Sequence, residues 1–195
     1  MSPVAPTRRI CVYCSSSSRI EQRYLLAARG LGDLIARRGH SLVFGGAAVG
    51  LMHEVAEAAL AGGAEVLGVI PEYIQGQGIA HTRLTELVVT RDMRERKRIM
   101  EERSDAFVCL PGGFGTLEEI LEVLTLKQLS YHDSPVVFVN LDGFYDGLFA
   151  FFEQLFRMSF ARREFRSLYH VAEDAENALR YIEEYVPEEP VSKWF

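Results

Sequence analysis

The sequence predicts an α/β fold: a single Rossmann-like doubly wound domain whose mostly parallel sheet has about six or seven strands flanked by helices. Short apolar runs alternate with longer segments of helical periodicity along most of the 195 residues. The apolar runs are continuous, as expected for parallel strands covered on both faces. Several of them end in small or glycine-rich turns, which is where sheets of this kind hold their ligands.

The expected elements follow from this alternation. Strands are predicted at residues 9–14, 41–44, 65–70, 84–89, 105–110, 135–140 and 167–171. Helices are predicted at residues 21–38, 50–61, 91–103, 116–129, 144–158 and 174–186. The first helix places Leu25, Leu31 and Ile35 on one face, and Gly39 is its expected C-cap. Pro71 ends the third strand, and residues 72–82 are predicted to be a loop.

The composition is that of one globular domain. We predict a flexible N-terminus at residues 1–8, a domain at 9–186 and a loose tail at 187–195. The net charge of −6 argues against nonspecific nucleic-acid binding. No apolar run reaches the roughly 18–20 residues of a membrane span, and the N-terminus lacks a signal-peptide core. Three cysteines make no disulfide framework, so a cytoplasmic protein is expected. The net charge and the lack of a membrane span predict that the protein has no nucleic-acid or membrane partner.

Cys11 and Cys14 form a CxxC pattern on a predicted strand, where their side chains should point to opposite faces. Redox-active CxxC pairs lie at helix N-termini instead, and only Cys109 is left to complete a zinc site. A structural role is therefore favoured over a redox or metal role.

The most informative segment is PGGFGTLEE at residues 111–119, between a predicted strand and a predicted helix. Such a turn presents unpaired backbone N–H groups and the positive end of a helix dipole to an anion. Glycine lets the backbone approach a phosphate closely. Glu118 and Glu119 follow at once, and a phosphate cradle with adjacent carboxylates suggests chemistry on a phosphorylated sugar. The turns at 15–18 and 45–48 should meet this one in a single crevice.

Each of these patterns also has a purely structural interpretation. Thr116 and Glu119 match a capping box, which only stabilises a helix start. Glu118 and Thr125 share a helix face that could line a pocket or face solvent. The basic segment at 91–98 could be a solvated surface. Its cations oppose the helix dipole, however, and a broken local rule of this kind favours a functional site.

Several other chemistries are not supported by the sequence. The dinucleotide fingerprint G-x-G-x-x-G after the first strand is absent, which disfavours NAD. The five histidines form no HExxH or comparable pair, and there is no G-x-S-x-G nucleophile elbow. No metal and no cofactor are therefore expected.

The two motifs PGGFGTxxE (residues 111–119) and MRERK (residues 93–97) together resemble the Lonely-guy family, and the similarity extends from Val12 to about Ile182. These proteins are cytokinin riboside 5′-monophosphate phosphoribohydrolases, often mislabelled as lysine decarboxylases. The resemblance implies hydrolysis of the N-glycosidic bond of an N6-modified adenosine 5′-monophosphate to the free base and ribose 5-phosphate. It also implies a homodimer with the active site near the interface.

By the same resemblance, Arg96 and Glu119 are the expected catalytic residues. Glu119 would bind the ribose hydroxyls and orient water, and Arg96 would offset developing charge. The expected substrate-binding residues are Lys97, Gly46, Gly112, Gly113, Gly115, Thr116, Glu118 and Thr125.

The sequence departs from the family pattern at Arg94, Ala47, His53, Gly78 and Leu126. These positions are expected at the pocket rim, so they bear on base and prenyl preference more than on reaction type. Two other functions stay open. One is a nonhydrolytic carrier of a nucleotide or of the molybdenum cofactor, and the other is a nucleosidase with broad specificity for nucleoside monophosphates. A pyridoxal-phosphate decarboxylase using Lys127 is the least supported.

Overall fold

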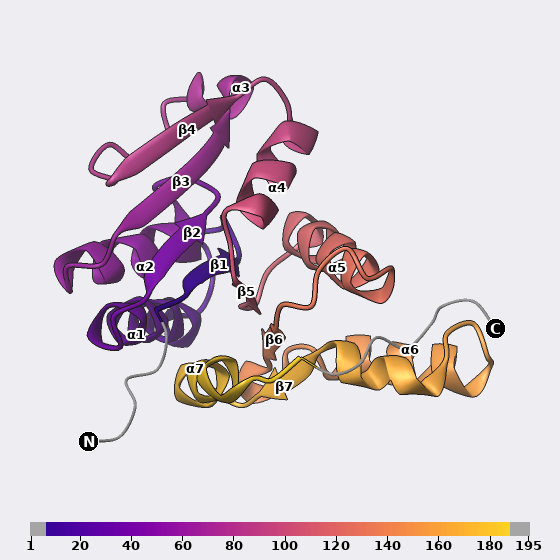
Figure 1. The fold of residues 1–195 in the computed structure, drawn as a ribbon. Coiled ribbons are helices and arrows are strands. Elements are labelled where there is room, and N and C mark those ends of the chain that lie inside the picture. Colours follow the sequence, from indigo (N-terminus) through magenta and orange to yellow (C-terminus); the bar gives the residue numbers. More distant parts are fainter. Residues whose placement is uncertain (1–6, 188–195) are drawn as a thin grey trace.

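The computed structural model describes residues 7–187, which form a seven-stranded sheet in the order β4-β3-β2-β1-β5-β6-β7. All neighbouring strands of this sheet are parallel (Figure 1). The strands are β1 (Arg9–Tyr13), β2 (Ser41–Phe44), β3 (Val66–Pro71), β4 (Glu86–Thr90), β5 (Ala106–Cys109), β6 (Val136–Val139) and β7 (His170–Ala172). The α-helices are α1 (Gln22–Arg37), α2 (Gly50–Ala61), α3 (Glu72–Gln75), α4 (Met93–Glu102), α5 (Phe114–Gln128), α6 (Asp146–Arg157) and α7 (Ala175–Glu184). Two 3₁₀ turns, η1 (Leu141–Gly143) and η2 (Arg163–Leu168), complete the described part.

The predicted α/β class and the order of the predicted elements are confirmed. Some details differ. The expected loop at 72–82 begins with the short helix α3, because Pro71 ends β3 in an extended conformation that serves as its N-cap. The last strand begins at His170 rather than 167, since the residues before it form η2. The helix expected from 91 begins at Met93, after the N-cap Asp92. The predicted N-terminal boundary at 8 lies next to undescribed residues, and nearly all of the predicted tail lies outside the described residues.

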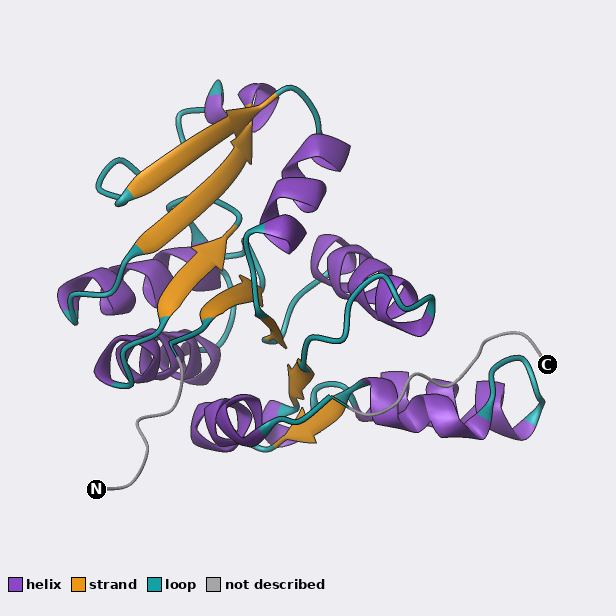
Figure 2. Ribbon diagram, in the orientation of Figure 1, coloured by secondary structure: helices purple, strands orange, loops and turns teal. Residues whose placement is uncertain are grey.

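Each face of the sheet is covered by its own set of helices, as Figure 2 shows. Alternate residues of β1 divide between two cores: Ile10 and Val12 pack with α1, α2 and α7, whereas Cys11 and Tyr13 pack with α4 and α5. The continuous apolar runs in the sequence thus reflect strands buried on both sides. A third, smaller core of phenylalanines (Phe152, Phe156 and Phe165) lies beneath α6 and η2.

The same alternation places the two cysteines of the CxxC pattern on opposite faces of the sheet. Cys11 belongs to one core and Cys14 to the core on the opposite face, as predicted. Both thiols are free and buried, and burial raises the pKa of the Cys11 thiol to about 12. Thiols that stay protonated are poor nucleophiles and poor metal ligands.

The central strand β1 lies between β2 and β5, so the chain reverses its winding direction there. A doubly wound sheet opens a crevice at this switch point, beyond the carboxyl ends of its strands. The turns after β1, β2 and β5 all emerge at this edge, and they are the three turns that the sequence analysis expected to converge. Among residues 7–187, no helix is long and apolar enough to cross a bilayer.

Candidate active site

A cavity of about 470 Å³ opens at the switch point. Its lining includes residues 15–17 after β1, Gly45, Ala47 and Val49 after β2, and residues 113–116 after β5. This volume is within the range of roughly 300–1,000 Å³ of small-molecule sites. The predicted convergence of the three turns on one crevice is therefore what the structure has.

The ten predicted site residues divide into two groups. Those that line the cavity are Arg96, Gly113, Gly115, Thr116 and Glu119. Those that are not part of its lining are Gly46, Lys97, Gly112, Glu118 and Thr125.

Arg96 and Glu119 meet at the cavity wall. Nη1 of Arg96 donates to Oε1 of Glu119 at 2.6 Å, and its Nε donates to the carbonyl oxygen of Val69 at 3.0 Å. Their exposed fractions are only 8% and 7%, which is rare for charged side chains unless they are paired. Burial raises the pKa of Glu119, and Arg96 offsets part of this rise. A carboxylate held this way can accept a hydrogen bond from a hydroxyl or water and is easily protonated.

The glycine-rich turn presents the N-terminus of α5 to the same cavity. The helix has Gly113 as its N-cap, with no side-chain capping bond. The first helical hydrogen bond is donated by the N–H of Leu117 to the carbonyl of Gly113. The N–H groups of residues 114–116 precede this bond, and all three residues line the cavity. Such a terminus is suited to an anion.

The capping-box interpretation of Thr116 and Glu119 is wrong. The helix begins at Phe114 rather than Thr116, so Thr116 lies within the first turn. The carboxylate of Glu119 pairs with Arg96 instead of reaching back to the helix start. Gly112 lets Thr116 fold against the turn, because a Cβ on residue 112 would lie 2.1 Å from Oγ1 of Thr116.

The charges at the start of α4 also differ from those that the sequence analysis expected. Asp92 is the N-cap and accepts the backbone N–H groups of Arg94 and Glu95, each at 2.9 Å. Arg91 precedes the helix and pairs with Glu95. The dipole of α4 is thus complemented by acidic groups, and the expected conflict with basic residues is largely absent. What distinguishes this helix is the burial of Arg96 and Lys97 on its inner face.

Lys97 lies behind the cavity in a group of carboxylates. Its Nζ pairs with Glu118 and Glu122 across the interface of α4 and α5. Thr125 is exposed and donates its hydroxyl hydrogen to the carbonyl of Leu121 at 2.8 Å. Gly46 lies beside the cavity, where its carbonyl accepts the N–H of His81. None of these three residues lines the cavity.

Glu101 lies one turn after Lys97 on α4, near the same carboxylates. Burial and the neighbouring Glu122 raise its pKa to about 7. The folded-state pKa lies above the unfolded one, so the stability that this group contributes is complete below about pH 4.5 and is lost as the pH rises through 7. We predict that Glu101→Gln raises the melting temperature relative to wild type more at pH 8 than at pH 5.5. The check is thermal unfolding at both pH values, with Glu102→Gln as the control. An equal effect of Glu101→Gln at both pH values contradicts this prediction.

Gly45 makes room for the arginine. A Cβ on residue 45 would lie 2.2 Å from Nη2 of Arg96 and 2.9 Å from Sδ of Met52. We predict that Gly45→Ala displaces the guanidinium, lowers the stability by roughly 1–3 kcal/mol and reduces turnover of the substrate at least tenfold. The control is Gly30→Ala on α1, where an added Cβ meets nothing within 4 Å. This control should stabilise the helix by up to about 1 kcal/mol. Wild-type melting and activity in Gly45→Ala contradict the steric argument.

An apolar part of the cavity was missed by the sequence analysis. It is made by Met52, Ile74, Ile79 and Met93, which come from α2, α3, the following loop and α4. From the sequence alone, a methionine or isoleucine on a helix face is interpreted as part of the hydrophobic core. No regular spacing links these four positions. Their convergence depends on the tertiary fold.

Comparisons with known proteins show relatives over most of the chain. A family model described as possible lysine decarboxylase matches residues 52–182. A probable cytokinin riboside 5′-monophosphate phosphoribohydrolase of Oryza sativa subsp. japonica is 45% identical over 180 residues, which cover 92% of this chain and 79% of the relative. A cytokinin riboside 5′-monophosphate phosphoribohydrolase of Arabidopsis thaliana is 42% identical over 181 residues, covering 93% and 83%.

Solved structures show the same architecture. The molybdenum cofactor carrier protein of Chlamydomonas reinhardtii aligns with a TM-score of 0.69 at 25% identity, covering 92% of this chain and 98% of that one. The molybdenum cofactor binding protein of Rippkaea orientalis, at 23% identity and a TM-score of 0.70, shares the fold.

The fold and the cavity define a doubly wound α/β protein with a glycine-rich turn and a buried Arg–Glu pair at its switch point. The sequence matches extend over most of the chain. The chain belongs to the Lonely-guy family, as the two motifs indicated. The decarboxylase description of the family model has no matching site here, since Lys127 donates to the hydroxyl of Tyr185 and does not line the cavity.

Proposed function

We propose that this protein hydrolyses the N-glycosidic bond of N6-modified adenosine 5′-monophosphates and releases the free base and ribose 5-phosphate. The names of relatives that are 40–45% identical support this activity. The observation that carries the proposal is the buried Arg96–Glu119 pair, which lies on the same cavity as the N-terminus of α5. Binding a nucleotide alone requires no such pair.

In the proposed mechanism, the 5′-phosphate binds the free N–H groups at the start of α5. The ribose then lies against Glu119, whose carboxylate holds the sugar hydroxyls and orients the attacking water. Cleavage passes through an oxocarbenium-like state, which a nearby carboxylate stabilises. Arg96 keeps the carboxylate oriented and offsets the charge that develops as the base leaves.

The apolar part of the cavity suggests which bases are accepted. Met52, Ile74, Ile79 and Met93 offer a surface for a hydrophobic N6 substituent. Of the five departures from the family pattern, Ala47 lines the cavity. Arg94 lies next to Met93 and Gly78 next to Ile79, so both can influence the shape of this wall.

Product analysis tests the proposal directly. The protein is incubated with adenosine 5′-monophosphate, its N6-prenylated form and monophosphates of other bases, and the products are separated by chromatography. The proposal expects equimolar free base and ribose 5-phosphate, with faster release of the prenylated base. Equal rates for every base favour a nucleosidase of broad specificity. Binding of nucleotides without any base release leaves the carrier function, and it defeats the hydrolase.

We propose further that the active form is a homodimer with the cavity near the interface. Phe114 supports this, because its side chain lies at the cavity and is 94% exposed. Covering this apolar ring with a partner would remove it from water, which favours association. Light scattering at micromolar concentration distinguishes the dimer from a monomer. A cytoplasmic location stays a prediction from cysteine usage.

A further inference from the structure

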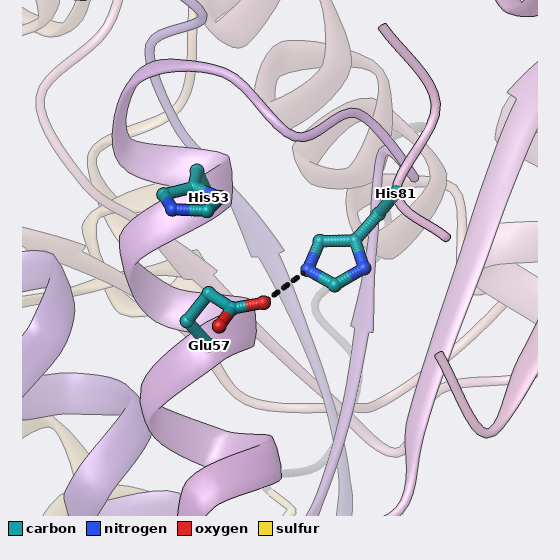
Figure 3. A group of neighbouring side chains, drawn as sticks. All are labelled: His53, Glu57 and His81. Carbon is teal, nitrogen blue, oxygen red and sulfur yellow. Dashed lines mark hydrogen bonds and ion pairs between the residues drawn. The ribbon is translucent and has the colours of Figure 1, made fainter. Parts of the chain in front are cut away.

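Three potential metal ligands converge outside the cavity. His53 and Glu57 lie four residues apart on α2, and His81 follows the loop after α3. One donor atom of each lies within 4.8 Å of the others. Figure 3 shows the carboxylate of Glu57 directed at the ring of His81, with the ring of His53 one helical turn away. Histidines separated by 28 residues give no ligand-spacing signal in a sequence, so the group was not expected.

One nitrogen of the group lacks a partner. Nδ1 of His53 is buried and has no hydrogen-bond partner among the described residues. Leaving a buried polar atom unpaired costs free energy, and such an atom points to a bound water or ion. The other members are held in place: Nε2 of His81 lies 2.8 Å from Oε1 of Glu57, and Arg83 pairs with Oε2.

We propose that His53, Glu57 and His81 bind one divalent transition-metal ion of the zinc class. Two imidazoles and one carboxylate are a donor set that zinc accepts, with a water in the fourth position. The same donors disfavour magnesium and calcium, which prefer oxygen ligands. Arg83 orients the carboxylate from outside, as partners of metal ligands commonly do.

Coordination requires a small rearrangement of the cluster. Bonds of about 2.0–2.1 Å place tetrahedral donors roughly 3.3 Å apart, so the cluster must contract, which rotation of the His53 ring can provide. Nδ1 of His81 accepts the N–H of Arg83 at 3.2 Å, so Nε2 carries the ring proton. When the metal binds Nε2, this proton moves to Nδ1 and the ring stays neutral. The hydrogen bond from Arg83 is then lost; at 3.2 Å it is at the long end of the normal range.

The ion would connect two parts of the cavity wall. Helix α2 carries Met52 and the loop carries Ile79, and both side chains line the cavity. The loop is already joined to the turn after β2, because Ala48 donates its N–H to Ile79 at 2.7 Å. A metal between α2 and His81 adds a second connection. It stabilises the wall that faces the substrate and takes no part in bond cleavage.

The test measures metal binding by the full chain, freed of metal with a chelator and kept reduced. Zinc is titrated by calorimetry and by thermal unfolding, and cobalt(II) is titrated by visible absorption, which reports tetrahedral nitrogen and oxygen ligands. The variants are His53→Asn and Glu57→Gln. The matched control is Glu54→Gln, which makes the same change on the same helix, at a carboxylate that pairs with Arg29.

We expect one zinc ion per chain, a higher melting temperature with zinc, and an affinity at least tenfold weaker in His53→Asn and Glu57→Gln. Glu54→Gln should bind like the wild type. Melting curves without metal establish that each variant folds. The proposal fails if the wild type shows no saturable site with one ion per chain, or if all four proteins bind zinc equally. Because no turnover is measured, these outcomes are independent of the hydrolase.

Discussion

Glu119→Gln is expected to reduce base release by about 10²–10⁴-fold while the protein remains folded, because glutamine keeps the oxygen that accepts the Arg96 hydrogen bond but cannot act as a carboxylate. The side chain is almost the same size, so the cavity of about 470 Å³ should keep its shape. The measurement is the rate of base release from N6-prenylated adenosine monophosphate, with circular dichroism as the check of folding.

The control for this variant is Glu122→Gln, one turn further along α5, where the carboxylate pairs with Lys97 outside the cavity. It makes the same chemical change on the same helix and should retain most of the activity. Turnover near the wild-type rate in Glu119→Gln removes the carboxylate from the mechanism and with it the main support for the hydrolase.

Arg96→Met is expected to lower the free energy of unfolding by up to roughly 3–5 kcal/mol, because it leaves a buried carboxylate without its partner. Without Arg96, the buried negative charge of Glu119 can be removed only by protonation. Burial already raises the pKa of this carboxyl group. A raised folded-state pKa stabilises the fold at low pH and loses that stability as the pH rises. The variant should therefore lose more stability than the wild type between pH 5 and pH 8, as measured by urea unfolding of both proteins.

The double variant Arg96→Met with Glu119→Gln tests the cause. It removes the unpaired charge, so we expect it to regain much of the lost stability and to depend on pH in this range no more than the wild type does. Arg98→Met is the matched control on α4, since its exposed pair with Glu102 contributes at most about 1 kcal/mol. A double variant no more stable than Arg96→Met at pH 8 contradicts the pairing argument.

Much of the fold was predictable because each strand is short and continuously apolar, and because amphipathic helices separate most strands from the next one. Ile10 to Tyr13 could only be a strand buried on both faces, and the two cores on either side of β1 agree with this. The exceptions, α3 and η2, are short helical segments. Their few hydrogen bonds leave no periodic pattern, so local sequence favours a loop equally well.

The candidate site, too, was predictable from the sequence only in part. The glycine-rich turn and the residues of the two motifs were identified from the sequence, and the structure brings Arg96 and Glu119 into direct contact although they are 23 positions apart. Glu118 and Thr125 do not line the cavity, because a shared helix face says nothing about which neighbour that face meets.

By itself the sequence determined the order of the strands and helices and the position of the glycine-rich turn at 111–116, because these depend on local hydrophobic patterning and backbone chemistry. The resemblance to the family is what pointed to Arg96 and Glu119. Only the tertiary structure decided which side chains meet. The winding reversal at β1 joins three turns into one cavity, and the packing of α2 against the loop before β4 brings His53 and Glu57 to His81. Such contacts depend on long-range packing, which no local pattern encodes.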